Sequence, residues 1–586
     1  MDNPEKKPRS ARPRKALDRD PRPPHPTSIA GAQGRVLDPA SALMVDGVAP
    51  RPTVYVGPRL LVSKAVDVDG AVTVLRAVAQ PLGWDVVPED EDQRTVNLTF
   101  GYVPLRLVVA SNRATIAPDA WTLLQQTRAQ FGVDSVKGVS LDHLVAPTIT
   151  GNPLHDGDPL HDGDPLHDGD PLHDGDPLHD GDPLHDGDPL HDGDPLHDGD
   201  PLHDGDPLHD GDPLHDGDPL HDGDPYGNPR SAARSSRAIA TYLQMGFGGR
   251  QPVAYVGAAP RRRRDDAITG RRPVVAVLDT GCGKHPWLNR YVKKDVTLNG
   301  EPIGYSDATS VSPEDEGNQS GPLDGSIDPL SGHGTFIAGL IRQRCPDADI
   351  VSWRVVPSDG PIVESDLVAT LAQIAEVARR YRAGEPGGHP IDVLNLSMGY
   401  YHETPEDELF DPTMYSILQE MSRNGVVVVA SAGNDATSRP SFPAAFCRWS
   451  DGNGPIPFDP SIAPIISVGA LNPNRTAALF SNAGPWVNTD APGAAVVSTL
   501  PAFRGGFEPV ARTRAFGRVR ESIDPDDFRG GFAVWTGTSF SAPIVAGNVA
   551  AALVGTLEPA DAPVDAATAV NTAWTAVSTS TGLARS

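Results

Sequence analysis

Residues 537–543 read Gly-Thr-Ser-Phe-Ser-Ala-Pro, and this stretch decides how the rest of the chain is interpreted. A glycine-bearing turn precedes Ser539, and the apolar run 542–554 that follows predicts a buried helix. Backbone N–H groups at a helix N-terminus are unpaired, and the potential there is positive. Ser539 would therefore lie where developing negative charge can be stabilised, as a nucleophile requires. The alternative for this stretch alone is that Ser539 only caps the helix.

Length, cysteine content and hydropathy limit the class of protein. The chain has 586 residues, which predicts two or three domains. Three cysteines, Cys282, Cys345 and Cys447, are too few for a disulfide framework and fit a reducing compartment or a large core. Neither a signal-peptide segment nor an apolar run of about 18 residues occurs. We therefore expect a cytoplasmic protein that does not cross a membrane, with export by a leaderless route left open.

Residues 153–224 are twelve identical copies of Pro-Leu-His-Asp-Gly-Asp. Their 24 aspartates account for most of the net charge of -28, and the rest of the chain carries only -4. One leucine in six residues, with a proline and a glycine in every copy, predicts a disordered linker. A weak metal-binding or pH-sensitive tract is the second interpretation. A six-residue solenoid is disfavoured by the repeated proline.

Composition shifts divide the chain into five segments. We expect a disordered basic tail at 1–50, a small α/β domain at 51–149, the repeat linker at 150–224, a second linker at 225–270 and a larger domain at 271–580. The basic run in the tail is interpreted as solvated, so no nucleic-acid partner is expected. The basic cluster 261–264 in the second linker would be an accessible cleavage site.

Hydrophobic periodicity predicts the elements of both domains. In the small domain we expect strands at 53–63, 96–100, 105–110 and 139–145, and helices at 71–82 and 119–131. In the larger domain we expect strands at 274–278, 351–356, 393–396, 426–430 and 465–468, and helices at 335–341, 367–377, 405–424 and 542–554. Strands alternating with helices predict a parallel sheet with helices on both faces, whose reactive residues lie beyond the carboxyl ends of the strands.

Two further stretches complete a candidate catalytic set. Asp279 directly follows the strand 274–278, and His333 opens a helix in Ser-Gly-His-Gly-Thr. A serine hydroxyl needs a base to take its proton, and the base needs a carboxylate to hold its tautomer. Asp279, His333 and Ser539 provide one residue of each type. For Asp279 alone, capping of the following turn is the alternative.

These stretches resemble the catalytic motifs of the subtilisin-like serine proteases (subtilases), in the order Asp279, His333, Ser539, over about residues 272–575. The resemblance implies a subtilisin-like α/β fold and a serine endopeptidase that cleaves peptide bonds through an Asp-His-Ser triad and an acyl-enzyme. A catalytically silent subtilase fold that acts as a binding module is the alternative. The complete set of catalytic residues argues against it.

The resemblance extends to the substrate cleft. Asn434 matches the oxyanion-hole asparagine of the family, and Ser397, Gly399, Ser431 and Gly433 match segments that pair with an extended peptide. Protein or peptide substrates are implied, with a large apolar side chain before the cleaved bond. No cofactor is required. Structural Ca²⁺ occurs in the family, but no ligand set, and hence no metal residue, can be assigned here. A turn role is the alternative for Asn434.

Three segments have no fixed interpretation. Residues 51–149 occupy the place of the family's propeptide, which implies an intramolecular contact with the catalytic domain; an unrelated regulatory domain is the alternative. The acidic loop 307–328 is either a surface insertion or a feature that favours basic residues in the substrate. Cys282, three residues after Asp279, is either a buried inert thiol or a site of oxidant sensitivity.

Overall fold

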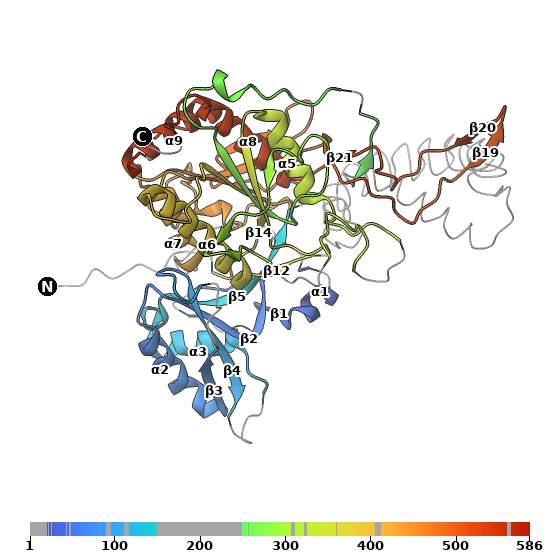
Figure 1. Ribbon diagram of the computed structural model, residues 1–586. Helices are drawn as coiled ribbons and strands as arrows, with labels where there is room; N and C mark the ends of the chain where they lie inside the picture. The colour runs from blue at the N-terminus through green and yellow to red at the C-terminus, as the bar shows by residue number, and fades with distance from the viewer. Residues whose placement is uncertain are drawn as a thin grey trace, which may run out of the picture.

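The computed structural model describes residues 20–148 and 249–585, with gaps at 22, 25, 41, 43, 46–47, 90–94, 111–115, 256, 306–310, 321–324, 359, 405–411 and 560–563. The basic tail up to residue 19 and the whole repeat tract lie outside the described residues. The described chain forms a small body, blue in Figure 1, beneath a larger one. None of the helices in the described ranges is both long and apolar enough to cross a bilayer.

A seven-stranded parallel sheet forms the centre of the larger body. Its strand order is β17 (Thr489–Pro492), β16 (Ile465–Leu471), β15 (Val427–Ser431), β13 (Val393–Leu396), β7 (Val274–Asp279), β11 (Asp349–Arg354) and β8 (Val292–Lys293). The interior strand β7 is buried along its whole length, because both of its faces are covered. The predicted parallel α/β sheet is confirmed.

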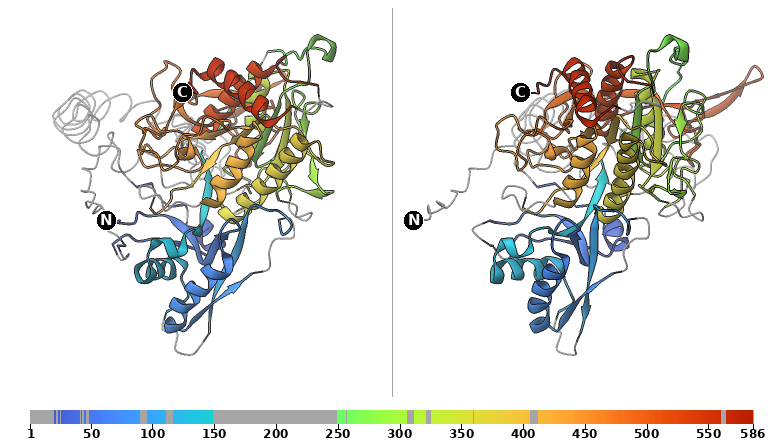
Figure 2. Two further views of the ribbon diagram at one scale, coloured as in Figure 1. Left: turned by 90° about the vertical axis from the view of Figure 1, so that its left-hand side faces the viewer. Right: turned by 60° about the vertical axis from the view of Figure 1, so that its left-hand side comes forward.

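Helices cover both faces of this sheet (Figure 2). One face packs against α5 (His333–Arg344), α8 (Thr538–Leu553) and α9 (Ala566–Thr581), and the other packs against α6 (Glu364–Ala383) and α7 (Pro412–Arg423). Alternate residues of β7 point to opposite faces of the sheet. Val275 and Val277 join the α5/α8 core, and Ala276 and Leu278 join the α6/α7 core. The N-terminal ends of α5 and α8 thereby reach the carboxyl edge of the sheet.

The small body is an antiparallel sheet with two helices on one face. Its strands are β1 (Gly34–Val36), β2 (Val54–Ser63), β3 (Trp84–Pro88), β4 (Tyr102–Val109) and β5 (Val139–Pro147), and its helices are α2 (Val68–Ala79) and α3 (Ala120–Phe131). Asp67 and Asp119 cap the two helices by accepting backbone N–H groups. Gly83 and Gly132, with positive φ, follow the helical segments at the predicted stops.

The strand expected at 96–100 does not form. Among the described residues of that stretch, Leu98 and Phe100 pack against the core of the larger body from a turn region. The edge strand is instead β3, in which Trp84 and Val86 are buried in the small body's core. The prediction of a strand at 96–100 is therefore wrong. The apolar residues of this stretch pack against the larger body, and β3 pairs with β4 at the edge of the sheet instead.

Strand β5 joins the two bodies. It pairs antiparallel with β12 (Ile362–Val363) and with β14 (Met398–Gly399), both from the larger body. The Asp142 carboxylate accepts hydrogen bonds from the backbone N and Oγ of Ser365, each at 2.9 Å, at the start of α6. A carboxylate from the small body thus caps a helix of the larger one.

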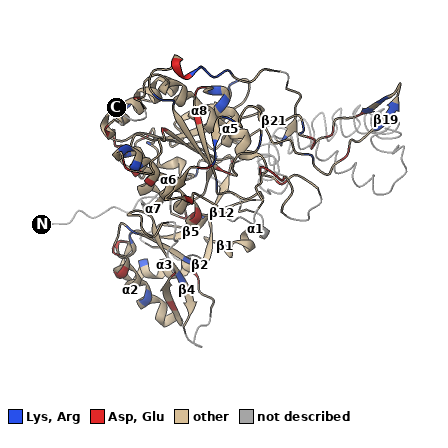
Figure 3. Ribbon diagram, in the orientation of Figure 1, with Lys and Arg blue, Asp and Glu red and all other residues tan. Residues whose placement is uncertain are grey.

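Apart from 3-10 turns, the remaining elements of the described chain are short. They are α1 (Pro26–Gly31), β6 (Gln251–Pro252), β9 (Thr297–Leu298), β10 (Glu301–Pro302), β18 (Val496–Thr499), β19 (Arg512–Ala515), β20 (Arg518–Glu521) and β21 (Phe532–Trp535). The β19–β20 hairpin projects from the body and carries basic residues (Figures 1 and 3). Strand β6 pairs with β21.

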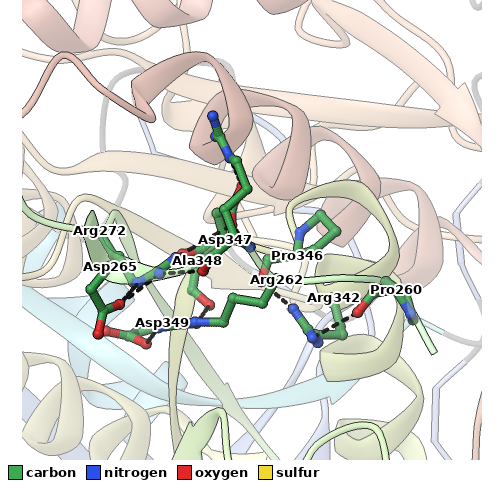
Figure 4. A network of polar contacts seen from close by, with 10 residues as sticks. Pro260, Arg262, Asp265, Arg272, Arg342, Pro346, Asp347, Ala348 and Asp349 are labelled. Carbon is green, nitrogen blue, oxygen red and sulfur yellow. Dashed lines mark hydrogen bonds and ion pairs between the residues drawn. The ribbon is translucent and has the colours of Figure 1, made fainter. Parts of the chain in front are cut away.

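The basic cluster expected in an open linker is in part engaged with the larger body. Arg262 donates to Ala348 O at 2.7 Å, and the backbone N and Nε of Arg263 donate to the Asp347 carboxylate at 2.8 and 2.7 Å. Figure 4 shows Arg262, Arg272 and Arg342 in the surrounding network. Arg261, Arg263 and Arg264 nevertheless stay exposed. Within the described part of the linker, residues 249–270, these ion pairs reduce the accessibility on which a cleavage site depends.

Candidate active site

Asp279 and His333 are joined by a direct hydrogen bond. Asp279 is the last residue of β7, and His333 is the first residue of α5. The Nδ1 atom of His333 lies 2.7 Å from Asp279 Oδ1, and both side chains are fully buried. Asp279 Oδ1 also accepts the backbone N–H of Thr280 at 2.8 Å. The predicted juxtaposition at the sheet's carboxyl edge is therefore present, with the tautomer of His333 held by a carboxylate.

The glycines around His333 serve backbone packing rather than exposure of the ring. Gly332 has φ +86°, a left-handed conformation that favours glycine. A Cβ on Gly334 would lie 2.0 Å from the carbonyl oxygen of Gly281. The ring itself contacts Trp535 and Phe540, with centroid distances of 5.6 and 5.4 Å. Among the described residues its Nε2 atom has no hydrogen-bond partner.

Ser539 lies in the first turn of α8, as the sequence predicts, and is fully buried. Pro543 has no N–H, so the Ser539 carbonyl lacks the donor that a helix normally supplies four residues later. Ser397 Oγ donates to that carbonyl instead, at 2.9 Å. The hydroxyl of Ser539 donates to Ser397 O at 3.0 Å and lies 2.8 Å from Thr148 Oγ1. Ser397 thus hydrogen-bonds both the backbone carbonyl and the hydroxyl of Ser539.

Asn434 offers a free amide donor beside Ser539. Its Oδ1 accepts the backbone N and the Oγ1 of Thr538, both at 2.9 Å. Two donors on the oxygen fix the orientation of the amide. Its Nδ2 atom is buried and has no hydrogen-bond partner among the described residues. An unsatisfied buried donor next to a candidate nucleophile is the arrangement that an oxyanion requires.

The end of β5 lies against this set of residues. Pro147 pairs with Met398, and Ala146 pairs with Gly399. The backbone N of Thr148 donates to Ser397 O at 3.2 Å, and the backbone N of Ser539 donates to Thr148 O at 3.1 Å. The sequence did not single out Thr148, since its partner Ser539 is 391 residues away. Its one local signal is that it lies three residues after the predicted strand 139–145 and shortly before the repeats.

The four predicted substrate-lining residues divide into two groups. Ser397 and Gly399 contact the β5 end as described, and Ser431 Oγ accepts from Thr148 Oγ1 at 2.6 Å. Gly433 has no such contact among the described residues. Its N–H donates to Thr538 Oγ1 at 3.1 Å, and a Cβ there would lie 2.2 Å from Asn482 Nδ2. Gly433 therefore supports the turn before Ser539.

A second buried histidine lies at the junction of the two bodies. His143 of β5 places Nδ1 2.6 Å from Glu364 Oε2 and Nε2 2.9 Å from Glu403 Oε2, and all three side chains are fully buried. Burial opposes charge on the ring, but the two carboxylates outweigh it and raise the pKa of His143 to about 10. His143 is thus an imidazolium clamped between two carboxylates.

The same region contains the group of residues that comes nearest to a metal site in the described chain. Ligand atoms of His143, His402 and Glu403 lie within 4.8 Å of one another. Both ring nitrogens of His143 already bond carboxylates, and Thr404 N donates to His402 Nδ1 at 3.1 Å. Calcium prefers carboxylate and carbonyl oxygens, so two imidazoles do not suit it. This cluster therefore does not fit the calcium that the sequence resemblance allows.

Cys282 is buried close to the site. Burial raises the pKa of its thiol to about 12, with the nearby Glu314 as a smaller cause. A thiol with so high a pKa forms little thiolate near neutral pH and reacts slowly. Of the two interpretations of Cys282, the structure favours the inert thiol.

Comparison with known proteins agrees with this geometry. The sequence model described as the subtilase family, Peptidase S8, matches residues 270–584. Subtilisin BL of Lederbergia lenta is 28% identical over 243 residues, covering 40% of this chain and 68% of its own. The major intracellular serine protease of Bacillus subtilis (strain 168) is 24% identical over 298 residues, covering 48% of this chain and 69% of its own.

Among solved structures, fervidolysin from Fervidobacterium pennivorans, a keratinolytic enzyme related to subtilisin, is 18% identical, with a TM-score of 0.38 over 87% of this chain and 56% of that one. The family match spans more than half of the present chain and includes Asp279, His333 and Ser539. The chain belongs to the subtilase family and is a subtilisin-like serine endopeptidase.

Proposed function

We propose that Ser539 is the nucleophile, His333 the general base and acid, and Asp279 the carboxylate that orients His333. Ser539 Oγ attacks the carbonyl carbon of a peptide, and His333 Nε2 takes the hydroxyl proton. Asp279 stabilises the imidazolium through the Nδ1 hydrogen bond of 2.7 Å. The imidazolium then protonates the leaving amine, and water, deprotonated by His333, releases the acyl group. The free lone pair of His333 Nε2 supports this role.

The backbone N–H of Ser539 and Asn434 Nδ2 would hold the oxyanion of the tetrahedral intermediate. The observation that carries the proposal is a carbonyl already bonded to one of these donors: Thr148 O accepts from Ser539 N at 3.1 Å. An extended segment of the chain thus presents a peptide carbonyl at the candidate nucleophile. This supports protein or peptide substrates bound by strand addition along β14.

A fluorophosphonate probe tests the assignment of Ser539. The probe is attacked by an activated serine, so we expect wild type to be labelled and Ser539→Ala to be unlabelled. Ser541→Ala, which changes a buried serine two residues away, is the matched control and should label normally. A folded wild-type protein that takes no label would instead support the silent, peptide-binding alternative.

We further propose that residues 51–149 act as a propeptide-like inhibitor and that the enzyme cleaves its own chain after Thr148. The pairing of β5 with β12 and β14 and the position of Thr148 support this. Wild type should yield an N-terminal fragment ending at Thr148 by mass spectrometry, whereas Ser539→Ala should remain intact. A fragment ending elsewhere, or the same fragment from Ser539→Ala, would contradict the proposal.

Thr148 also bears on substrate preference. Its hydroxyl donates to Ser431 Oγ at 2.6 Å, where family resemblance suggested a large apolar side chain. We propose that the cleft accepts a small hydroxyl residue before the cleaved bond, preceded by Pro147. A chromogenic peptide ending in Val-Ala-Pro-Thr should have a higher kcat/KM than one ending in Val-Ala-Pro-Phe. The reverse ranking would support a large apolar side chain before the cleaved bond.

A further inference from the structure

The acidic loop 307–328 turns the carboxylate of Glu314 inward. Glu314 is only 2% exposed, whereas its neighbours Asp315 and Glu316 are exposed. A buried carboxylate is costly unless donors surround it. This position fits neither of the roles that the loop's composition suggested, a surface insertion or an attraction for basic substrate residues.

Glu314 contacts the residues that directly follow both Asp279 and His333. Its Oε1 accepts the backbone N–H of Gly334 at 3.1 Å and the hydroxyl of Thr280, and its Oε2 accepts the hydroxyl of Thr335. Gly334 N also donates to Thr280 Oγ1 at 2.9 Å. One side chain therefore bridges the end of β7 and the first turn of α5.

Helix α5 has no cap of its own. Its N-cap residue is Gly332, which makes no side-chain hydrogen bond. A carboxylate at a helix N-terminus satisfies an orphan N–H and interacts favourably with the helix dipole. Glu314 supplies this carboxylate from 20 residues before Gly334, at the turn that begins with His333.

We propose that Glu314 is a positioning residue that holds the Asp279–His333 pair in its reactive geometry by fastening the residue after each of them. The inference rests on the proposed triad, since it assigns Glu314 no contact with substrate. Small displacements of a base from its reactive position cost about a hundredfold in rate. A bridge between the two motifs limits that displacement.

The charge of Glu314 links this bridge to pH. The charged or titratable groups that face it are Asp279, His333, Arg250 and the thiol of Cys282. Burial is the main cause that raises the pKa of Glu314 to about 7, and the threonine hydroxyls oppose it. Above this pKa the carboxylate accepts all three donors. Below it, the carboxyl gains a proton that must compete with them, so the bridge weakens.

An acid pH therefore acts on the site through Glu314, because protonation of this carboxyl loosens the support of the Asp279–His333 pair. We expect the acid-side slope of log(kcat/KM) to be greater for the processed wild-type enzyme than for Glu314→Gln, because the variant lacks this carboxyl. A purely structural role would lower the folded fraction and leave this slope unchanged.

The experiment compares Glu314→Gln with Glu316→Gln, an exposed neighbour of the same charge, using the Val-Ala-Pro-Thr peptide. Active-site titration with fluorophosphonate corrects for folded enzyme. We expect Glu314→Gln to lower kcat about ten- to a hundredfold with less than about a twofold change in KM, and Glu316→Gln to match wild type. Unchanged kcat and acid slope in titrated Glu314→Gln would overturn the inference.

A second variant tests the same bridge in case Glu314→Gln does not fold. Thr335→Val removes the donor to Glu314 Oε2 while keeping the shape of the side chain, and should lower kcat in the same direction by a smaller factor. Wild-type kcat and acid slope in Thr335→Val would count against the bridge. Failure of the triad itself would be recognised separately, because Ser539→Ala would then keep both label and activity.

Discussion

The structure contains two fully buried histidine–carboxylate clusters, one at the end of β7 and one on β5, and they differ in how the ring nitrogens are bonded. In the first, His333 bonds Asp279 through Nδ1 and leaves Nε2 without a partner among the described residues. In the second, His143 bonds Glu364 and Glu403 through both nitrogens. A proton shuttle needs a free lone pair, whereas a structural clamp needs none. The free nitrogen, rather than burial or a carboxylate partner, separates the chemical site from the junction.

The largest effect should come from removing the imidazole of His333. His333→Ala should lower kcat by about 10⁴–10⁶, because the base is lost. Peptide hydrolysis measures this quantity. The comparison would fail if His333→Ala kept the kcat of wild type.

At the junction of the two bodies we expect an effect on stability rather than on catalysis. In the uncut Ser539→Ala chain, His143→Leu leaves Glu364 and Glu403 as buried charges without their partner, which should destabilise the contact by about 3–5 kcal/mol. The measurement is the denaturant dependence of the unfolding step that separates the bodies. His155→Leu in the first repeat is the control. An unfolding step indistinguishable from that control would show that the clamp contributes nothing.

Asn434→Ala should reduce kcat about 10²–10³-fold with little change in KM. The physical reason is that its unpartnered Nδ2 bonds oxygen only when that atom becomes an oxyanion. Asn453→Ala, on an exposed turn, is the control. An equal rise in KM with unchanged kcat would instead mean that Asn434 binds the ground state.

The two clusters should also differ in pH response. The pKa of His143 is raised to about 10 when the bodies are docked, from about 6.5 when it is free. Its contribution to docking is therefore complete below about pH 6.5 and is lost as the pH rises through 10. In uncut Ser539→Ala we expect stability to fall by about 1.4 kcal/mol per pH unit within this window. His143→Gln should remove the slope, and a slope that persists would have another origin.

The smallest effect concerns Cys282. Because burial raises the pKa of its thiol to about 12, iodoacetamide at pH 8 should leave the activity of folded enzyme unchanged. Rapid inactivation that Cys282→Ala abolishes would mean that the thiol becomes exposed during turnover.

The parallel sheet and the position of Ser539 could be predicted because their signals are local. The run 274–278 is apolar without interruption, and Ser539 lies between a glycine turn and an apolar helix. Asp279 and His333 were singled out from short motifs at a strand end and a helix start, and Asn434 from the resemblance to the subtilases.

Thr148, Glu314 and Arg250 could not be found in this way. Arg250 donates to Ile327 O and Asp328 O at 3.0 and 2.7 Å and lies 4.8 Å above the Trp535 ring, beside His333, although it belongs to an expected linker. The partners of each of these residues lie elsewhere in the sequence. The composition of the flanking residues predicts only a linker or an acidic loop. The composition of a segment does not reveal which of its residues turns inward.

The most direct test of the account is to map the fluorophosphonate adduct by peptide mass spectrometry in wild type and in His333→Ala. The account predicts an adduct on Ser539 in wild type and at least a hundredfold slower labelling of the same residue once the imidazole is removed. An adduct on another serine, or labelling of Ser539 at the same rate without His333, would contradict it.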